Sequence, residues 1–140
     1  MNSPFSGRRV FVVEDEVLVA WLLEDMLAEI GCAVVGPAGS VNQALAMIDA
    51  EAIDVAVLDV NLKGEMSYPI ADALAARGVP FVFVTGYDKD RMLEGYRTCP
   101  VLQKPFHRAE LTDTLAKLLT PKEPSAEPMI ATVAKTFSLS

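Results

Sequence analysis

The sequence is poor in the residues that build zinc sites and disulfide frameworks. Its 140 residues include two cysteines, Cys32 and Cys99, and one histidine. The cysteines lie far apart and form no CxxC pair, so neither a structural zinc site nor a disulfide-stapled domain is indicated. We therefore expect both thiols to be ordinary buried or half-buried side chains.

Long apolar runs are also missing. None approaches the roughly 18 residues that a membrane-spanning helix needs. The opening segment MNSPFSGRRV has no apolar stretch after its charges of the kind that a secretory signal requires. The sequence thus predicts neither a membrane span nor a signal peptide, and we expect the protein to be cytoplasmic.

Basic residues are outnumbered by acidic ones. Twelve Lys and Arg residues stand against nineteen Asp and Glu residues, which gives a formal net charge of −7. This charge repels nucleic-acid phosphates and anionic lipids, so we expect neither as a partner, and a cationic partner or a metal ion fits better. Nucleotide-binding signatures are absent too, because neither GxGxxG nor GxxxxGK[ST] occurs and VGPAGS has no lysine.

The chain does contain short apolar runs that alternate with segments of helical periodicity. Its length and its hydrophobic content of 51% suit one globular domain. The runs expected to form strands span residues 10–13, 33–35, 55–58, 81–84 and 101–102. Strands that are apolar on both faces and joined by helices predict an α/β fold with a parallel sheet covered on both sides.

Apolar residues recur at helical spacing between these runs. The strongest pattern extends over residues 19–30, and Gly31 is expected to end that helix. Ser40 can cap a second helix, and leucines within residues 111–119 mark the last one. Shorter and weaker helical segments are expected at residues 71–76 and 92–96.

Polar residues follow four of the expected strands at their carboxyl ends. In chain order they are Glu14 and Asp15, then Asp59, Thr85 and Lys104. Right-handed crossovers bring the carboxyl ends of parallel strands to one edge of the sheet, which is where ligands bind in such folds. We therefore expect these side chains to converge.

A cluster of acids at this edge indicates a divalent cation. Neighbouring carboxylates repel one another, and Mg²⁺ suits carboxylate oxygens together with retained waters. A carboxylate at the edge could then attack phosphorus and form an aspartyl phosphate. The cation and Lys104 would offset the charge of the phosphoryl oxygens, and the Thr85 hydroxyl could donate a hydrogen bond to one of them.

Four segments in this order, VVEDE, VLDVNL, VTGY and QKPF, resemble the motifs of the receiver domains of two-component response regulators. The resemblance extends over about residues 8–119. It implies a doubly wound, flavodoxin-like fold with helices on both faces of a five-stranded parallel sheet. Counted along the chain, the strands would have the order 2-1-3-4-5.

The same resemblance assigns roles to individual residues. Asp59 would be the phosphoacceptor. Mg²⁺ would be held by Asp15, Asp59 and the backbone carbonyl of Asn61, with Glu14 acting indirectly or through water. Thr85 and Lys104 would sense the phosphoryl group. The residues expected to flank the site are Gly86, Tyr87 and Pro105, and the Lys104–Pro105 peptide bond is expected to be cis.

The sequence departs from many receivers at one position. Val101 stands three residues before the lysine, where many receivers have an aromatic side chain that rotates together with the threonine. The segment FVTGY instead resembles the Phe-x-Thr-Gly pattern of a receiver subgroup that is commonly paired with histidine kinases of the HWE class. Gly86 would leave the site open, and Tyr87 would slow the attack of water.

Three further features have two interpretations each. Leu18 and Trp21 lie off the apolar stripe of the first helix and could form a docking site for a kinase, although Trp21 could equally pack under a loop. His107 could be interpreted as a site of phosphohistidine chemistry, yet in the family that the chain resembles the reacting histidine belongs to the kinase. We expect a receiver domain over residues 1–120 and a linker-like, flexible tail over residues 121–140, or alternatively a tail that docks on a domain.

Together these patterns predict a stand-alone response regulator. It would accept a phosphoryl group on Asp59 from a sensor histidine kinase, lose it by self-catalysed hydrolysis, and signal to a phosphotransfer or effector protein by contact rather than act as an enzyme. Two alternatives remain. One is a receiver-like binding module that is never phosphorylated, and the other is an aspartyl-nucleophile phosphohydrolase of the haloacid dehalogenase type, which Asn61 disfavours because such enzymes need an acid at that position.

Overall fold

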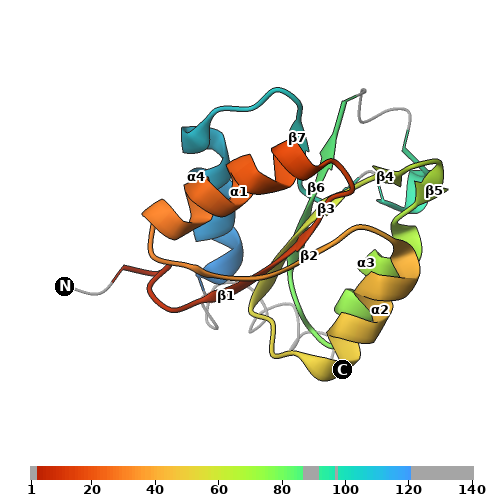
Figure 1. Cartoon of the computed structure of the whole chain (residues 1–140), viewed down its shortest axis with the longest axis horizontal. Coiled ribbons are helices and arrows are strands. Elements are labelled where there is room, and N and C mark those ends of the chain that lie inside the picture. Colours follow the sequence, from red (N-terminus) through yellow and green to blue (C-terminus); the bar gives the residue numbers. More distant parts are fainter. Residues whose placement is uncertain (1–2, 87–91, 97, 121–140) are drawn as a thin grey trace, which may run out of the picture.

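In the part of the chain that the structure describes, five parallel strands form a sheet with two helices on each face (Figure 1). This computed structural model describes residues 3–86, 92–96 and 98–120. The strands of the sheet are β1 (Arg9–Val13), β2 (Ala33–Ala38), β3 (Val55–Asp59), β6 (Phe81–Thr85) and β7 (Val101–Gln103). Their order is β2-β1-β3-β6-β7, so the predicted order 2-1-3-4-5 is confirmed when the strands of this sheet are counted along the chain.

Side chains of the strands alternate between two apolar layers. Val10 and Val12 of β1 belong to the layer under α1 (Val17–Glu29) and α4 (Arg108–Leu119). Phe11 and Val13 belong to the opposite layer, under α2 (Val41–Ala50) and α3 (Tyr68–Ala76). All four β1 side chains are at most 1% exposed, which explains why the strand reads as an uninterrupted apolar run.

The predicted helix boundaries agree with the structure at two positions. The backbone N–H of Gln43 donates a hydrogen bond to Ser40 Oγ over 3.1 Å, so Ser40 caps α2 as expected. The first helix ends at Glu29, and Gly31 beyond it has a φ of +97°, a conformation that favours glycine.

The weak helical segment expected at residues 92–96 is present only as a 3₁₀ turn, η2 (Glu94–Tyr96). The ring of Tyr96 stacks on that of Tyr68 with 4.4 Å between the ring centroids, and the Tyr96 hydroxyl donates a hydrogen bond to Asp72 Oδ1 over 2.7 Å. Contacts with α3, rather than a regular helix, therefore hold residues 92–96 in place.

Two backbone features were not expected from the sequence. A short antiparallel hairpin, β4 (Asn61–Leu62) and β5 (Glu65–Met66), follows β3 directly. In β2, Gly36 has a φ of +101° and precedes a cis peptide bond to Pro37. A Cβ atom at Gly36 would lie 2.8 Å from the carbonyl oxygen of Val12 in the neighbouring strand.

The remaining expectations concern thiols, membrane spans and the tail. Cys32 is buried and Cys99 is half-buried, as expected, and burial raises the pKa of the Cys32 thiol. Within the described parts of the chain, no helix has both the length and the apolar character that a membrane crossing requires. The predicted tail at residues 121–140 and the flanking residue Tyr87 lie outside the described residues.

Candidate functional site

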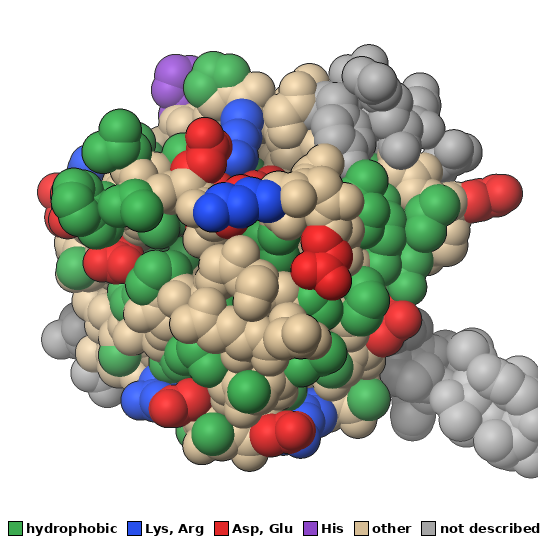
Figure 2. All heavy atoms as spheres, turned by 45° about the vertical axis from the view of Figure 1, so that its right-hand side comes forward, with side chains coloured by type: hydrophobic (Ala, Val, Ile, Leu, Met, Phe, Trp, Pro, Cys, Tyr) green, Lys and Arg blue, Asp and Glu red, His purple; other side chains and the backbone are tan. Residues whose placement is uncertain are grey.

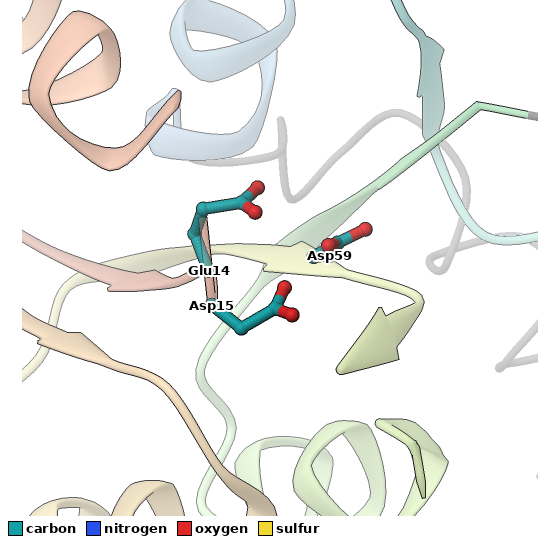
Figure 3. A group of neighbouring side chains, drawn as sticks. All are labelled: Glu14, Asp15 and Asp59. Atoms are coloured by element: carbon teal, nitrogen blue, oxygen red, sulfur yellow. The ribbon is translucent and has the colours of Figure 1, made fainter. Parts of the chain in front are cut away.

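Three carboxylates meet at the carboxyl edge of the sheet (Figure 3). Glu14 and Asp15 follow β1, and Asp59 is the last residue of β3, the strand that pairs with β1. One oxygen from each carboxylate lies within 4.8 Å of the oxygens from the other two. The sequence prediction that these acids converge is thus correct, because adjacent parallel strands deliver them to one place.

Burial concentrates the negative charge of this cluster. Glu14 is 3% exposed and Asp59 is 8% exposed, whereas Asp15 is half-buried. Burial, reinforced by the negative charges of Glu14 and Asp15, raises the pKa of Asp59 to about 7, although Lys104 opposes this shift. The cluster offers three hard oxygen donors, and the single positive charge of Lys104 does not neutralise all of their negative charge. Such a site fits a divalent cation such as Mg²⁺.

Lys104 supplies a positive charge to the same cluster. Its Nζ atom lies 3.3 Å from Glu14 Oε1 and 3.7 Å from Asp59 Oδ2. The backbone N–H of Lys104 donates a hydrogen bond to the Thr85 carbonyl over 2.7 Å, and the Lys104–Pro105 peptide bond is cis, as expected. The lysine therefore lies between two acids at the ends of different strands, Glu14 after β1 and Asp59 in β3.

Glu14 is held from two sides. One carboxylate oxygen accepts a hydrogen bond from Lys104, and the other accepts one from the backbone N–H of Glu16 over 3.1 Å. Its own backbone N–H donates to the carbonyl of Ala38 at the end of β2 over 2.9 Å. Glu14 is thus a buried and doubly hydrogen-bonded acid, whereas its neighbour Asp15 is half-buried.

Thr85 is the last residue of the neighbouring strand β6, and Gly86 follows it. Thr85 is 1% exposed and stands one residue beyond Val84, which pairs with Asp59. A Cβ atom added at Gly86 would meet nothing within 4 Å among the residues that the structure describes. Figure 2 brings the right-hand side of Figure 1 forward and shows acidic and basic side chains next to one another on that face.

Asn61 lies two residues beyond Asp59, in the unpredicted hairpin. Its backbone belongs to β4, where it pairs with Met66 of β5, and its side-chain Oδ1 accepts a hydrogen bond from the backbone N–H of Gly64 over 2.6 Å. The Lys63–Gly64 dipeptide was the signal that sequence reasoning missed, because a glycine in the second position of a two-residue loop is typical of tight hairpins.

The two residues suggested for docking lie on the surface of α1. Leu18 is 70% exposed and Trp21 is 59% exposed, so Trp21 does not pack in the core, which was the alternative interpretation. Beside them, a groove of about 210 Å³ is lined mainly by apolar side chains. Its lining residues are Val19, Leu22, Leu23, Met26, Lys104, Pro105 and Phe106. Lys104 thus contributes both to this groove and to the acidic cluster.

Comparison with known proteins places this arrangement in one family. A sequence model described as "response regulator receiver domain" matches residues 10–116. The transcriptional regulatory protein PdtaR of Mycobacterium tuberculosis is 30% identical over an alignment of 108 residues, and the match covers 74% of this chain and 53% of PdtaR. The chain therefore spans about half the length of the curated relatives that it matches.

Solved structures show the same fold. The solution structure of SdrG from Sphingomonas melonis is 45% identical, with a TM-score of 0.73 over 85% of this chain and 100% of SdrG. The receiver domain of the sensor histidine kinase PA1611 from Pseudomonas aeruginosa is 26% identical, with a TM-score of 0.67 over 81% of this chain and 98% of its own length. That crystal structure has a magnesium ion coordinated in its active site cleft. The present chain belongs to the response regulator receiver domain family of two-component signalling systems.

Proposed function

We propose that Asp59 accepts a phosphoryl group from a histidine kinase in a Mg²⁺-dependent reaction, and that the phosphorylated chain signals through protein contacts. The observation that carries this proposal is the environment of Asp59. Its carboxylate is buried, lies in a group of three acids whose oxygens are within 4.8 Å of one another, and is 3.7 Å from the ammonium of Lys104. A lone surface aspartate would have none of these features.

Asp15, Asp59 and the backbone carbonyl of Asn61 are the proposed direct ligands of Mg²⁺, and Glu14 would act through water. Glu14 suits an indirect role because both of its oxygens already accept hydrogen bonds, from Lys104 and from the backbone N–H of Glu16. When bound, the cation supplies positive charge that offsets the carboxylates and the phosphoryl oxygens. The magnesium ion in the cleft of the PA1611 receiver domain supports this assignment.

The residues of the chain would perform the transfer itself. A carboxylate oxygen of Asp59 attacks the phosphorus of a phosphohistidine, an oxygen–phosphorus bond forms, and the nitrogen–phosphorus bond breaks with its electron pair passing to the imidazole. Lys104 would pair with a phosphoryl oxygen, and the Thr85 hydroxyl would donate a hydrogen bond to another. Hydrolysis by water then returns the Asp59 carboxylate and releases inorganic phosphate.

A histidine kinase is proposed to dock on the exposed side of α1. Leu18 and Trp21 present apolar surface next to the groove that Lys104 and Pro105 line, so a docked helix would lie close to Asp59. The segment FVTG and the replacement of an aromatic residue by Val101 support a kinase of the HWE class as donor. A phosphotransfer or effector protein would then recognise the phosphorylated form.

Intact-mass measurement after incubation with acetyl phosphate and Mg²⁺ tests the proposal. The wild-type chain is expected to gain the mass of one phosphoryl group, and the gain should disappear in Asp59→Asn and when EDTA replaces Mg²⁺. Asp113→Asn, which changes an exposed aspartate on α4, is the matched control and should be labelled like the wild type. No adduct on the wild-type chain would favour a receiver-like module that is not phosphorylated, and sustained turnover of p-nitrophenyl phosphate would favour a phosphohydrolase.

A further inference from the structure

We infer that the β4–β5 hairpin pre-positions the backbone of Asn61 for the cation, and that the Asn61 side chain and Gly64 are its positioning residues. The inference rests on the proposed function, because it concerns the same Mg²⁺ site. It adds a role for two groups that do not themselves touch the cation. The hydrogen bond from the Gly64 N–H to Asn61 Oδ1, 2.6 Å long, is the contact that would do this.

The loop of the hairpin has the conformation of a type I′ turn. Lys63 has a φ of +54° and Gly64 has a φ of +91°, and this turn type requires positive φ at both central residues. Glycine adopts such a conformation without strain, whereas lysine does so at some cost. A tight turn containing a lysine at positive φ therefore needs other contacts to hold it, and the hydrogen bond to Asn61 Oδ1 is one.

The pattern of the hairpin leaves the carbonyl of Asn61 outside the ladder. Leu62 and Glu65 flank the two-residue loop, and the N–H of Ser67 donates to the carbonyl of Val60 over 2.8 Å. In an antiparallel pair, bonded and non-bonded residue pairs alternate. The Asn61–Met66 pair between them is therefore the non-bonded one, so the Asn61 carbonyl remains available to a ligand.

The residues on either side of Asn61 are anchored in the core. Val60 is 0% exposed, Leu62 is 3% exposed, and the N–H of Val60 donates to the carbonyl of Val84 in β6 over 3.0 Å. Asn61 itself is exposed. The direction of its backbone thus depends on the buried neighbours and on the hydrogen bond that its own side chain makes to the turn.

Loss of this hydrogen bond should weaken Mg²⁺ binding without removing a ligand. Without it, the free chain would spend part of its time in other loop conformations, and the apparent dissociation constant rises as the competent fraction falls. One ordinary hydrogen bond contributes enough free energy to change that constant by about three- to tenfold.

Calorimetric titration of the full chain with MgCl₂ tests the inference. Asn61→Ala removes the acceptor, and Gly64→Ala strains the turn at a φ of +91° where a Cβ atom would otherwise meet nothing within 4 Å. Both variants are expected to raise the dissociation constant by about three- to tenfold. Lys63→Gly is the matched control, because it keeps the hydrogen bond and relieves the positive φ, and it should bind within about twofold of the wild type. Faster hydrogen exchange of the Gly64 amide in Asn61→Ala would accompany the loss.

Different results overturn different statements. The positioning role alone would be overturned if acetyl phosphate labels the wild-type chain on Asp59 and yet Asn61→Ala and Gly64→Ala both bind Mg²⁺ with wild-type affinity. A wild-type chain that binds no Mg²⁺ would overturn both the positioning role and the proposed function. If Asn61→Ala does not fold, Gly64→Ala against Lys63→Gly gives the same comparison.

Discussion

The ionisation of Asp59 links the stability of the fold to pH. The pKa of its carboxyl group is raised from its ordinary value of 3.8 to about 7 in the folded chain, mainly by burial and next by the charge of Glu14. The folded state therefore keeps a proton that the unfolded state has released between these two values. Stability contributed by this group is complete below pH 3.8 and is lost as pH rises through about 7.

Replacing Asp59 by asparagine should remove this dependence on pH. In EDTA, the free energy of unfolding of Asp59→Asn minus that of the wild type is expected to be larger at pH 8 than at pH 5, because at pH 8 only the wild type holds a buried charge at position 59. Urea unfolding at the two pH values measures this difference, with Asp113→Asn as the control. The same relative stability at both pH values would contradict the environment assigned to Asp59.

The acids of the site were predictable, but their pairing was not. Each acid follows or ends an apolar run, and a parallel sheet brings such ends together whatever the details of packing. Lys104 Nζ lies closer to Glu14, at 3.3 Å, than to Asp59, at 3.7 Å. This difference depends on how β1, β3 and β7 pack, which no local sequence pattern predicts. For the same reason the burial of Glu14 could not be distinguished from a solvated acidic loop.

At the scale of the elements, β2 contains a position that only glycine fits. Gly36→Ala would place a Cβ atom 2.8 Å from the Val12 carbonyl, at a φ of +101°. We expect a loss of about 1–3 kcal/mol in the free energy of unfolding. Chemical denaturation checks this, with Gly95→Ala, where an added Cβ atom meets nothing within 4 Å, expected to change stability by no more than about 0.5 kcal/mol. Equal effects of the two substitutions would show that the close approach to β1 does not matter.

The elements that sequence reasoning missed are short or depend on tertiary contacts. β4 and β5 have two residues each, which is too short for any periodicity to be read. The segment at residues 92–96 has helical spacing, yet Tyr96 stacks on Tyr68 and bonds to Asp72, and these contacts fix a 3₁₀ turn. Strands β1, β3 and β6 were found because they are buried on both faces. Ser40 was found because its side chain caps α2 directly.

At the scale of the whole molecule, recognition of the kinase should be separable from the chemistry at Asp59. Trp21→Ala removes an exposed aromatic side chain of α1 and is expected to slow phosphotransfer from a phosphorylated histidine kinase by about tenfold or more, because central aromatic anchors often carry much of the binding energy of an interface. Labelling by acetyl phosphate, which needs no docking, should be unchanged.

Leu93→Ala is the matched control for this comparison. Leu93 is 58% exposed, similar to Trp21 at 59%, but it contacts the Tyr68 hydroxyl of α3 through its backbone N–H and lies away from the groove beside α1. Phosphotransfer to this variant should match that of the wild type. If Trp21→Ala accepts phosphoryl groups from the kinase as fast as Leu93→Ala does, the docking site lies elsewhere.

The central claim is that the acids at the edge of the sheet share one cation and thereby prepare Asp59 for phosphorylation. A crystal structure of the chain grown with Mg²⁺ tests it most directly. We predict a single ion bound by the carboxylates of Asp15 and Asp59 and by the backbone carbonyl of Asn61. An ion held by other residues, or carboxylates of Asp15 and Asp59 too far apart to share one, would contradict the account.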